Sequence, residues 1–341
     1  MNLLEIDGSF GEGGGQILRS ATTLACITQT PIRVKNIRSN RKIPGLRPSH
    51  LTAIKILAKM CNAHVDGLSV GSTSVEFHPD RIDNVFLEED VGTAGSIPLI
   101  MQAVIPLALA GKKLQVSIRG GTDVPWSPTT NYTKYVLAEA YSRMGLDFAM
   151  KIQKRGYYPR GGGLVHLTVN PCTELSPVHL IKRAEKKANL VCCYTDEDRI
   201  SDSIGCARDL LESNGFATSV EKSQEKADNS GASMLVFSHD SNSIIGADEL
   251  LDLKNRSDFG KRCARDFVGY GMGVDANLSD MLVTPLSLCK ELSIFTVPSI
   301  SKHLETNLYI TSKLTGCKYG IGKIDGGYEV RLQGSSNSCI K

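Results

Sequence analysis

The chain has 341 residues, of which 41% are hydrophobic and 22% charged, and its formal net charge at pH 7 is +3. This length allows a full-sized core and more than one domain, and the composition is typical of a soluble globular protein. No apolar run is long enough to span a bilayer, and the first residues are too few for a signal peptide. We therefore expect a cytoplasmic protein without a membrane partner, and the net charge alone is too weak to indicate a nucleic-acid partner.

A glycine-rich turn spans residues 7–20, where a short apolar strand runs into glycines and then into a helix that begins near Gln16. The glycines stand at positions 11, 13, 14 and 15. They allow positive φ angles and a close approach of backbone N–H groups to a ligand, and the helix dipole points at the same place. This arrangement favours phosphate binding. An ordinary turn between a strand and a helix remains the alternative, because the spacing matches neither GxGxxG nor a Walker A loop.

Two charged residues of this turn extend the hypothesis. Glu12 lies among the glycines, where its carboxylate would repel a bound phosphate unless a divalent metal ion lay between them. Arg19 follows one helical turn after the glycines, on a face that can reach the same place. We expect Glu12 to bind a metal ion and Arg19 to bind phosphate, and a solvated pair of side chains is the alternative.

A basic segment follows at residues 31–50, which contain no acidic residue. It begins as a strand with one polar face, at residues 32–37, and continues as a loop. Its six basic residues are Arg33, Lys35, Arg38, Arg41, Lys42 and Arg47. Such a loop suits a polyanion, although a solvated edge strand and turn would show the same residues.

The rest of the first half alternates helices with short strands. Apolar periodicity predicts helices at residues 16–29, 48–62, 97–109 and 132–144. Strands are predicted at 64–70, 74–78 and 114–118, and glycine-containing turns precede the helices at 97 and 132. A turn, a helix and a strand thus recur at least three times, which predicts an α+β domain built from repeated units, each with two helices on a small sheet.

The composition changes after about residue 171, where the chain becomes more charged and loses its glycine triplets. Its own pattern is a strand at 188–194, a helix at 204–215, a strand at 217–221, a mobile polar loop at 222–231 and a strand at 233–238. We expect a small inserted α/β domain at residues 181–259, with the large domain formed by residues 1–180 and 260–341.

One of the seven histidines stands apart. His303 follows an apolar strand pattern at residues 293–297 and opens a helix that carries Leu304, Leu308 and Ile310. At the start of a helix the imidazolium form is disfavoured, so the neutral, nucleophilic ring is available near pH 7. From position alone, a structural or capping role for His303 remains open.

Taken together, these stretches resemble the RNA 3'-terminal phosphate cyclase family. The resemblance covers residues 2–175 and about 260–333 and rests on Glu12-Gly-Gly-Gly-Gln-Ile-Leu-Arg19, Ile37-Arg38 through Arg41 to Pro44-Gly-Leu-Arg47, Thr93-Ala-Gly-Ser96 with Gln102, Gly120-Gly-Thr122, Arg155-Gly-Tyr-Tyr-Pro-Arg-Gly-Gly-Gly163, and His303 with Thr306-Asn307. It implies a large domain of repeated units, two helices on a four-stranded sheet, with an architecture like that of the enolpyruvyl transferases. It also implies a small insert, as predicted above.

The resemblance further implies the chemistry. His303 would attack ATP to give a histidine–AMP intermediate, AMP would pass to the 3'-phosphate of RNA, and the 2'-hydroxyl would displace AMP to leave a 2',3'-cyclic phosphate. ATP and a divalent metal ion, Mg²⁺ or Mn²⁺, are the implied cofactors, and Glu12 matches the metal position. Phosphate or nucleotide positions are matched by Arg19, Arg38, Arg41, Gln102, Ser127, Pro128, Asn277, Leu278, Ser279, Asp280 and Met281, and RNA phosphate contacts by Arg47 and His50.

One run departs from the family pattern. Where the family commonly has Tyr-Leu-Ala-Asp-Gln, with an aromatic ring to stack on adenine, this chain has Asn277-Leu-Ser-Asp-Met281. Stacking contributes on the order of 1 kcal/mol. We therefore expect weaker ATP binding or relaxed base selectivity, while Asp280 is retained.

Two other functions remain as alternatives. A catalytically inactive relative would serve as an RNA-binding scaffold in ribosome biogenesis, but relatives of that kind lack the histidine. An enolpyruvyl transferase would share the architecture without a histidyl nucleophile. The sequence leaves the oligomeric state open, with a homodimer as one possibility.

Overall fold

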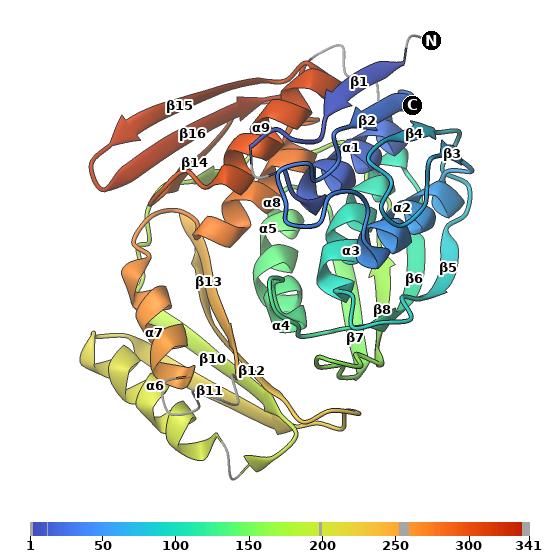
Figure 1. The fold of residues 1–341 in the computed structure, drawn as a ribbon. Coiled ribbons are helices and arrows are strands. Elements are labelled where there is room, and N and C mark those ends of the chain that lie inside the picture. The colour runs from blue at the N-terminus through green and yellow to red at the C-terminus, as the bar shows by residue number, and fades with distance from the viewer. Residues whose placement is uncertain (1–2, 12, 198–199, 252–258, 336–341) are drawn as a thin grey trace.

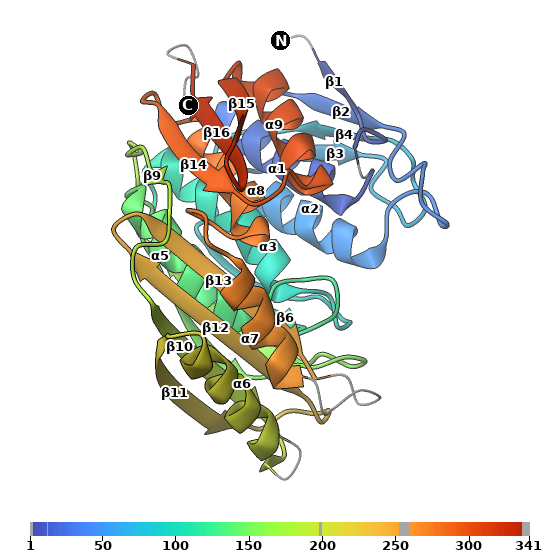
Figure 2. The same ribbon diagram turned by 90° about the vertical axis from the view of Figure 1, so that its left-hand side faces the viewer.

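The computed structural model describes residues 3–11, 13–197, 200–251 and 259–335, which form a mixed α/β fold with four four-stranded sheets (Figure 1). For three of the four sheets, helices connect the strands of one unit along the chain. The apolar faces of these helices join one continuous core. In the two views the helices lie at the centre of this body and the sheets lie around them (Figures 1 and 2). The α+β fold predicted from the sequence is confirmed in so far as helices are combined with several four-stranded sheets.

The three sheets of the large body have the same strand order. In each, the first two strands of the unit pair in parallel, and the last two strands pair antiparallel, with the fourth next to the second. The first unit consists of β1 (Leu4–Asp7), α1 (Gly15–Thr28), β2 (Ile32–Lys35), α2 (Pro48–Met60), β3 (His64–Asp66) and β4 (Val75–His78).

The second unit has longer strands and interrupted helices. It consists of β5 (Phe86–Asp90), α3 (Ile97–Val104), η1 (Ile105–Ala110), β6 (Leu114–Gly120), α4 (Thr130–Tyr132), η2 (Thr133–Leu137), α5 (Ala138–Arg143), β7 (Phe148–Lys154) and β8 (Gly163–Val169). The helix predicted at 97–109 becomes 3₁₀ at Ile105, directly before Pro106, whose missing N–H ends the α-helical pattern. The helix predicted at 132–144 contains a π-helical stretch.

The third unit is interrupted by the insert. Its elements are β9 (His179–Leu180), α8 (Ala276–Leu286), β14 (Ser293–Val297), α9 (Lys302–Thr315), β15 (Lys318–Ile324) and β16 (Gly327–Gln333). The insert enters after β9 and leaves before α8, so it separates the first strand of this unit from its first helix. Helix α1 of the first unit packs against α9 of the third unit, so the first and last units of the large body are in contact.

The insert has its own sheet, in the order β11-β10-β12-β13, and its own apolar core. Its elements are β10 (Lys187–Tyr194), α6 (Ser201–Ser213), β11 (Ala217–Gln224), β12 (Ala232–Asp240), β13 (Ser243–Leu250) and α7 (Phe259–Gly269). Helix α7 was expected in the large domain, but its Phe259, Cys263 and Phe267 are buried in the core of the insert. These contacts favour a boundary after Gly269 rather than after residue 259.

The predicted extent of the polar loop, residues 222–231, was wrong. Lys222 to Gln224 continue strand β11 in register with β10. Beyond the strand, Glu225 and Asp228 form ion pairs with Arg155 and Lys154 of the large body. The polar residues of this segment therefore form contacts between the insert and the large body, and the local sequence pattern does not reveal such contacts. Strands β5, β9, β13, β15 and β16 were not individually predicted.

Arg155 holds the insert to the large body. Its side chain is 2% exposed and pairs with Asp123 (3.1 Å) and with Glu225 of the insert (2.8 Å). Its third nitrogen donates to the side-chain oxygen of Asn131 (2.9 Å). A buried guanidinium surrounded by acceptors is satisfied, but removing it leaves buried carboxylate charge uncompensated.

We predict that Arg155→Met lowers the free energy of unfolding by about 3 kcal/mol, because Asp123 then remains buried without its cation. Urea denaturation followed by circular dichroism measures the change. Arg160→Met, five residues later on an exposed turn, is the matched control and is expected to change stability by less than about 0.5 kcal/mol. Equal stability of the two variants would show that the buried network does not hold the parts together.

Candidate active site

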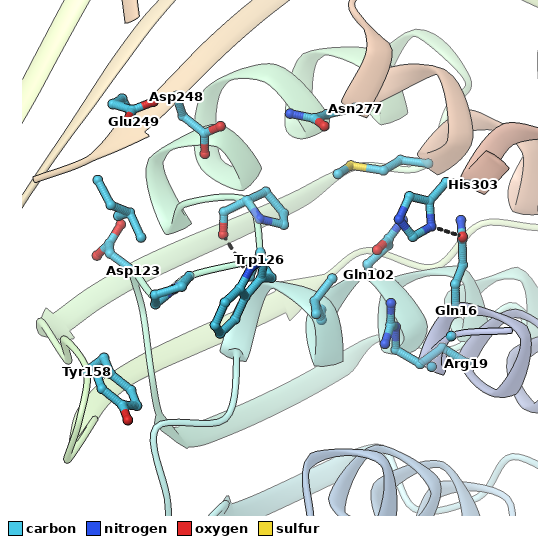
Figure 3. A pocket seen from close by; sticks show the side chains of 18 of the residues that line it. Gln16, Arg19, Gln102, Asp123, Trp126, Tyr158, Asp248, Glu249, Asn277 and His303 are labelled. Carbon is cyan, nitrogen blue, oxygen red and sulfur yellow. Dashed lines mark hydrogen bonds between the residues drawn. The ribbon is translucent and has the colours of Figure 1, made fainter. Parts of the chain in front are cut away.

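A cavity of about 1310 Å³ opens between the large body and the insert. It is lined by the start of α1, the loop after β2, α3, the loop after β6, α8, the start of α9 and one edge of the insert at 230–232 and 248–251. Figure 3 shows side chains from these distant segments directed into one space. Most residues predicted as functional meet here.

His303 lies at the first turn of α9, which Ser301 caps by accepting a hydrogen bond from the N–H of Leu304 (3.0 Å). The ring is exposed toward the cavity. Burial lowers the pKa of His303 below its ordinary value, and the positive charges of Arg19 and Arg41 lower it further. The neutral ring is therefore favoured near pH 7, through burial and arginine charge rather than through the helix start used in the sequence prediction.

A chain of hydrogen bonds selects the tautomer of His303. Its Nδ1 is bonded to Oε1 of Gln16, and Nε2 of Gln16 donates to Oδ2 of Asp280. A carboxylate oxygen accepts, so Asp280 fixes the amide of Gln16 with its oxygen toward the imidazole. An amide oxygen also only accepts, so Nδ1 of His303 carries the proton. Nε2 is left with its lone pair, as a nucleophile needs.

Asp280 is itself held in place. The side-chain amide of Asn307 donates to the backbone oxygen of Asp280 (2.7 Å), and the hydroxyl of Ser20 donates to Asn307 Oδ1 (2.7 Å). Burial raises the pKa of Asp280 to about 7, against the opposing effect of Arg19. Burial likewise lowers the pKa of Arg19 to about 10, with Asp280 opposing. Helices α1, α8 and α9 thus meet in one polar cluster at the cavity wall.

The glycine turn lies against α9. Gly11 and Gly13 have φ angles of 61° and 58°, the left-handed region that glycine adopts most readily. A Cβ at Gly11 would lie 2.2 Å from Oγ1 of Thr306, one turn after the histidine, so only glycine permits this approach. Gly14 and Gly15 have no positive φ, and a Cβ at Gly15 would meet His50.

The basic residues line the same wall. Arg19, Arg38, Arg41 and His50 reach the cavity, whereas Arg47 does not. Burial lowers the pKa of His50 to about 3, and the neighbouring arginines add to this effect. Its Nδ1 accepts from the backbone N–H of Arg47 (3.2 Å), so His50 is a neutral donor through Nε2 rather than a cation.

The positions matched to nucleotide contacts divide in two. Gln102, Ser127, Pro128, Asn277, Asp280 and Met281 line the cavity. Leu278 and Ser279 do not: Leu278 is fully buried, and the hydroxyl of Ser279 bonds to the backbone oxygen of Ala276. Residues 277, 280 and 281 share a helix face, whereas 278 and 279 point elsewhere. The structure therefore gives Leu278 and Ser279 packing positions.

The described residues do not form a metal site beside His303. Each described carboxylate of the cavity is engaged: Asp280 by Gln16, Asp123 by Arg155, Asp248 by the N–H of Thr129 and Glu249 by Arg262. Among the described residues, the grouping with metal-ligand spacing is Asp66, Glu76 and His78 on the first sheet, outside the cavity. Glu12, the predicted metal ligand, lies outside the described residues.

Sequence reasoning missed several lining residues. Gln16 stood in the recognised motif without a role, and its position at the helix start was the available signal. Trp126 precedes the assigned Ser127, and Tyr158 lies within the recognised motif at 155–163, but their exposure depends on tertiary structure. The insert residues Asp248 and Glu249 carry no local pattern, because β13 was not predicted.

Comparison with known proteins decides the family. A family model described as RNA 3'-terminal phosphate cyclase matches residues 10–321. The chain belongs to the RNA 3'-terminal phosphate cyclase family. It is 35% identical over 337 residues to the protein of that name from Methanosarcina barkeri, covering 97% of this chain and 100% of the relative. It is 36% identical to the proteins of the same name from Korarchaeum cryptofilum, covering 94% of each chain, and Thermococcus kodakarensis, covering 93% and 94%.

This family membership agrees with the resemblance seen in the motifs. Among the described residues, none of the helices combines the length and apolar character of a membrane span.

We predict that the pKa of His303 lies below 6.5 in the free cyclase, because burial and two arginines disfavour the cation. The neutral fraction therefore stays high as pH falls through 6.5 and is lost only below the lowered pKa. Arg41→Gln removes a positive charge and is expected to raise this pKa. Titration of the imidazole carbon shifts by NMR, assigned with His303→Asn, measures both values, and a wild-type pKa of 6.5 or above contradicts the argument.

A second prediction concerns the tautomer. In the wild type, ¹⁵N NMR is expected to show the proton of His303 on Nδ1. Gln16→Leu removes the acceptor, so the Nδ1–H form is no longer favoured, and the rate of histidine–AMP formation is expected to fall about tenfold. Asp280→Asn still accepts from Gln16 and should keep the Nδ1–H form. An unchanged tautomer in Gln16→Leu would refute the role of Gln16.

Proposed function

We propose that the protein converts the 3'-terminal phosphate of RNA into a 2',3'-cyclic phosphate at the expense of ATP. Family membership and the names of its relatives support this reaction. The observation that carries it is His303, held through Nδ1 by Gln16 at a cavity wall with three arginines. A nucleophile beside cations suits nucleotidyl transfer, in which charge develops on phosphoryl oxygens.

Three displacements complete the reaction. Nε2 of His303 attacks the α-phosphorus of ATP, forming a P–N bond while the bond to pyrophosphate breaks. An oxygen of the RNA 3'-phosphate then attacks the AMP phosphorus, the P–N bond breaks and the electron pair returns to Nε2. Finally the 2'-hydroxyl loses its proton and attacks the RNA phosphorus, and AMP leaves from the activated phosphoanhydride.

The residues of the chain supply charge and orientation. Arg19, Arg38 and Arg41 would bind the phosphates of ATP or of the RNA end, where planar guanidinium groups form paired hydrogen bonds. Gln102 and Pro128 would contact the nucleotide. Neutral His50 would donate to a phosphate oxygen. The requirement for Mg²⁺ or Mn²⁺ remains a proposal that depends on Glu12.

We expect the selectivity for ATP over other nucleotides to be weaker than in a protein with an aromatic residue at position 277. Asn277 is exposed at the cavity in the position where the family commonly has tyrosine. An amide adds hydrogen bonding but no stacking surface. We therefore expect GTP to be accepted as well as ATP.

The alternatives are less well supported. An inactive scaffold needs no histidine held for nucleophilic attack, and the relatives reported above are named as cyclases. The likeness to enolpyruvyl transferases, the cytoplasmic location, the division into two domains and a homodimer remain predictions from the sequence.

Incubation with α-labelled ATP and magnesium or manganese tests the proposal. We expect a covalent label that resists alkali and is lost in acid, as a histidine phosphoramidate is. His303→Ala should show no label, and chelation of the metal should abolish it. Addition of RNA with a 3'-phosphate should release AMP and yield the cyclic end.

His179→Ala is the matched control, since this histidine is exposed outside the cavity. It should label as the wild type does. If neither ATP nor GTP labels the wild type while RNA still binds, the scaffold function replaces the proposal.

A further inference from the structure

Two exposed aromatic side chains line the part of the cavity away from His303. Trp126 is the only tryptophan of the chain and is 98% exposed, and Tyr158 is 67% exposed. In Figure 3, Trp126 lies between Gln102 and Tyr158, and both rings are on the side opposite the histidine. Neither residue has a part in the three displacements described above.

The backbone at Trp126 is unfavourable for a tryptophan. Its φ angle is 62°, a region in which a bulky residue is rare and costs on the order of 1–3 kcal/mol. At 98% exposure the indole packs against almost nothing, so no burial of apolar surface offsets that cost. Strain without a packing benefit is typical of a ligand-binding position.

The positions on both sides of each ring are firmly held. Ser127 is bonded to Ser96, the cap of α3, and the N–H of Thr129 donates to Asp248 of the insert. Tyr157 is 4% exposed beside Tyr158, and the N–H of Arg160 donates to Asn229 (3.3 Å). Both rings are therefore presented from backbone of the large body that is held where it meets the insert.

The size of the cavity leaves room for two substrates. Its volume of about 1310 Å³ exceeds the roughly 300–1,000 Å³ of a site for one small ligand. A nucleotide reacting at His303 occupies the end with Gln102, Met281 and the arginines. The aromatic end remains, and exposed Arg160 follows directly after Tyr158 and Pro159.

We propose that Trp126 and Tyr158 form a stacking site for bases near the 3' end of the acceptor RNA. Aromatic rings beside basic side chains are the usual surface for single-stranded RNA, whose unpaired bases stack on them. This inference rests on the proposed function. It places the RNA against the wall that the insert completes and gives the insert a part in substrate binding.

The single tryptophan reports on this site directly. In the absence of ATP, a single-stranded RNA with a 3'-phosphate is expected to quench the fluorescence of Trp126 as a base stacks on the indole. ATP without RNA should leave the emission nearly unchanged. Stronger quenching by ATP than by RNA would assign the ring to the nucleotide and overturn the proposal, as would RNA binding without quenching.

Variants separate stacking from charge. Trp126→Ala and Tyr158→Ala are each expected to weaken RNA binding about tenfold, measured by anisotropy of a labelled RNA, and Trp126→Phe should restore most of the affinity. The salt dependence of binding should keep its slope, because no phosphate contact is lost. Tyr319→Ala, an exposed aromatic residue on β15 outside the cavity, should bind as the wild type does.

The first half-reaction distinguishes failure of this inference from failure of the proposed function. Both variants should form histidine–AMP at the wild-type rate without RNA. Wild-type RNA affinity in both variants, with histidine–AMP still formed, would refute the stacking site alone. Absence of histidine–AMP in the wild type would refute the proposed function.

Discussion

The hydrogen-bond chain from Asp280 through Gln16 to His303 is the interaction on which the site depends. Its members belong to α8, α1 and α9, and the sequence separates Gln16 from His303 by 287 residues. Only the packing of the first unit against the third brings them within hydrogen-bonding distance. The packing of the apolar core therefore determines which ring nitrogen of His303 carries the proton. A small displacement of α1 would move Gln16 away from the imidazole, and the ring could then exchange tautomers.

The insert acts on the same cavity from the opposite side. Its strand β13 supplies Asp248 and Glu249 to the wall, and Arg155 ties its body to the loop that carries Asp123. Burial raises the pKa of Asp248 to about 6, and the charges of Asp275 and Asp123 act in the same direction. The cavity thus has arginines on the wall of the large body and carboxylates where the insert joins it.

Local features of the site could be predicted from the sequence, and features that depend on tertiary packing could not. The helix starts near Gln16 and His303 followed from glycines, caps and apolar periodicity. Leu278 and Ser279 were carried over as part of a continuous run, although helical geometry directs them away from the cavity. The place of α7 in the insert and the exposure of Trp126 depend on neighbours far away in the chain, which no local pattern contains.

The position of the insert within the third unit has a consequence for biosynthesis. Strand β9 pairs with β14, so His179 meets Ile294 only after the whole insert has been made, and the closing loop carries an entropic cost. The first two units have short connections and can fold while the rest of the chain is still on the ribosome. Helix α9, which carries His303, is among the last elements to emerge. A nascent or prematurely ended chain therefore contains the arginines of the first unit before the helix that carries His303 has been made.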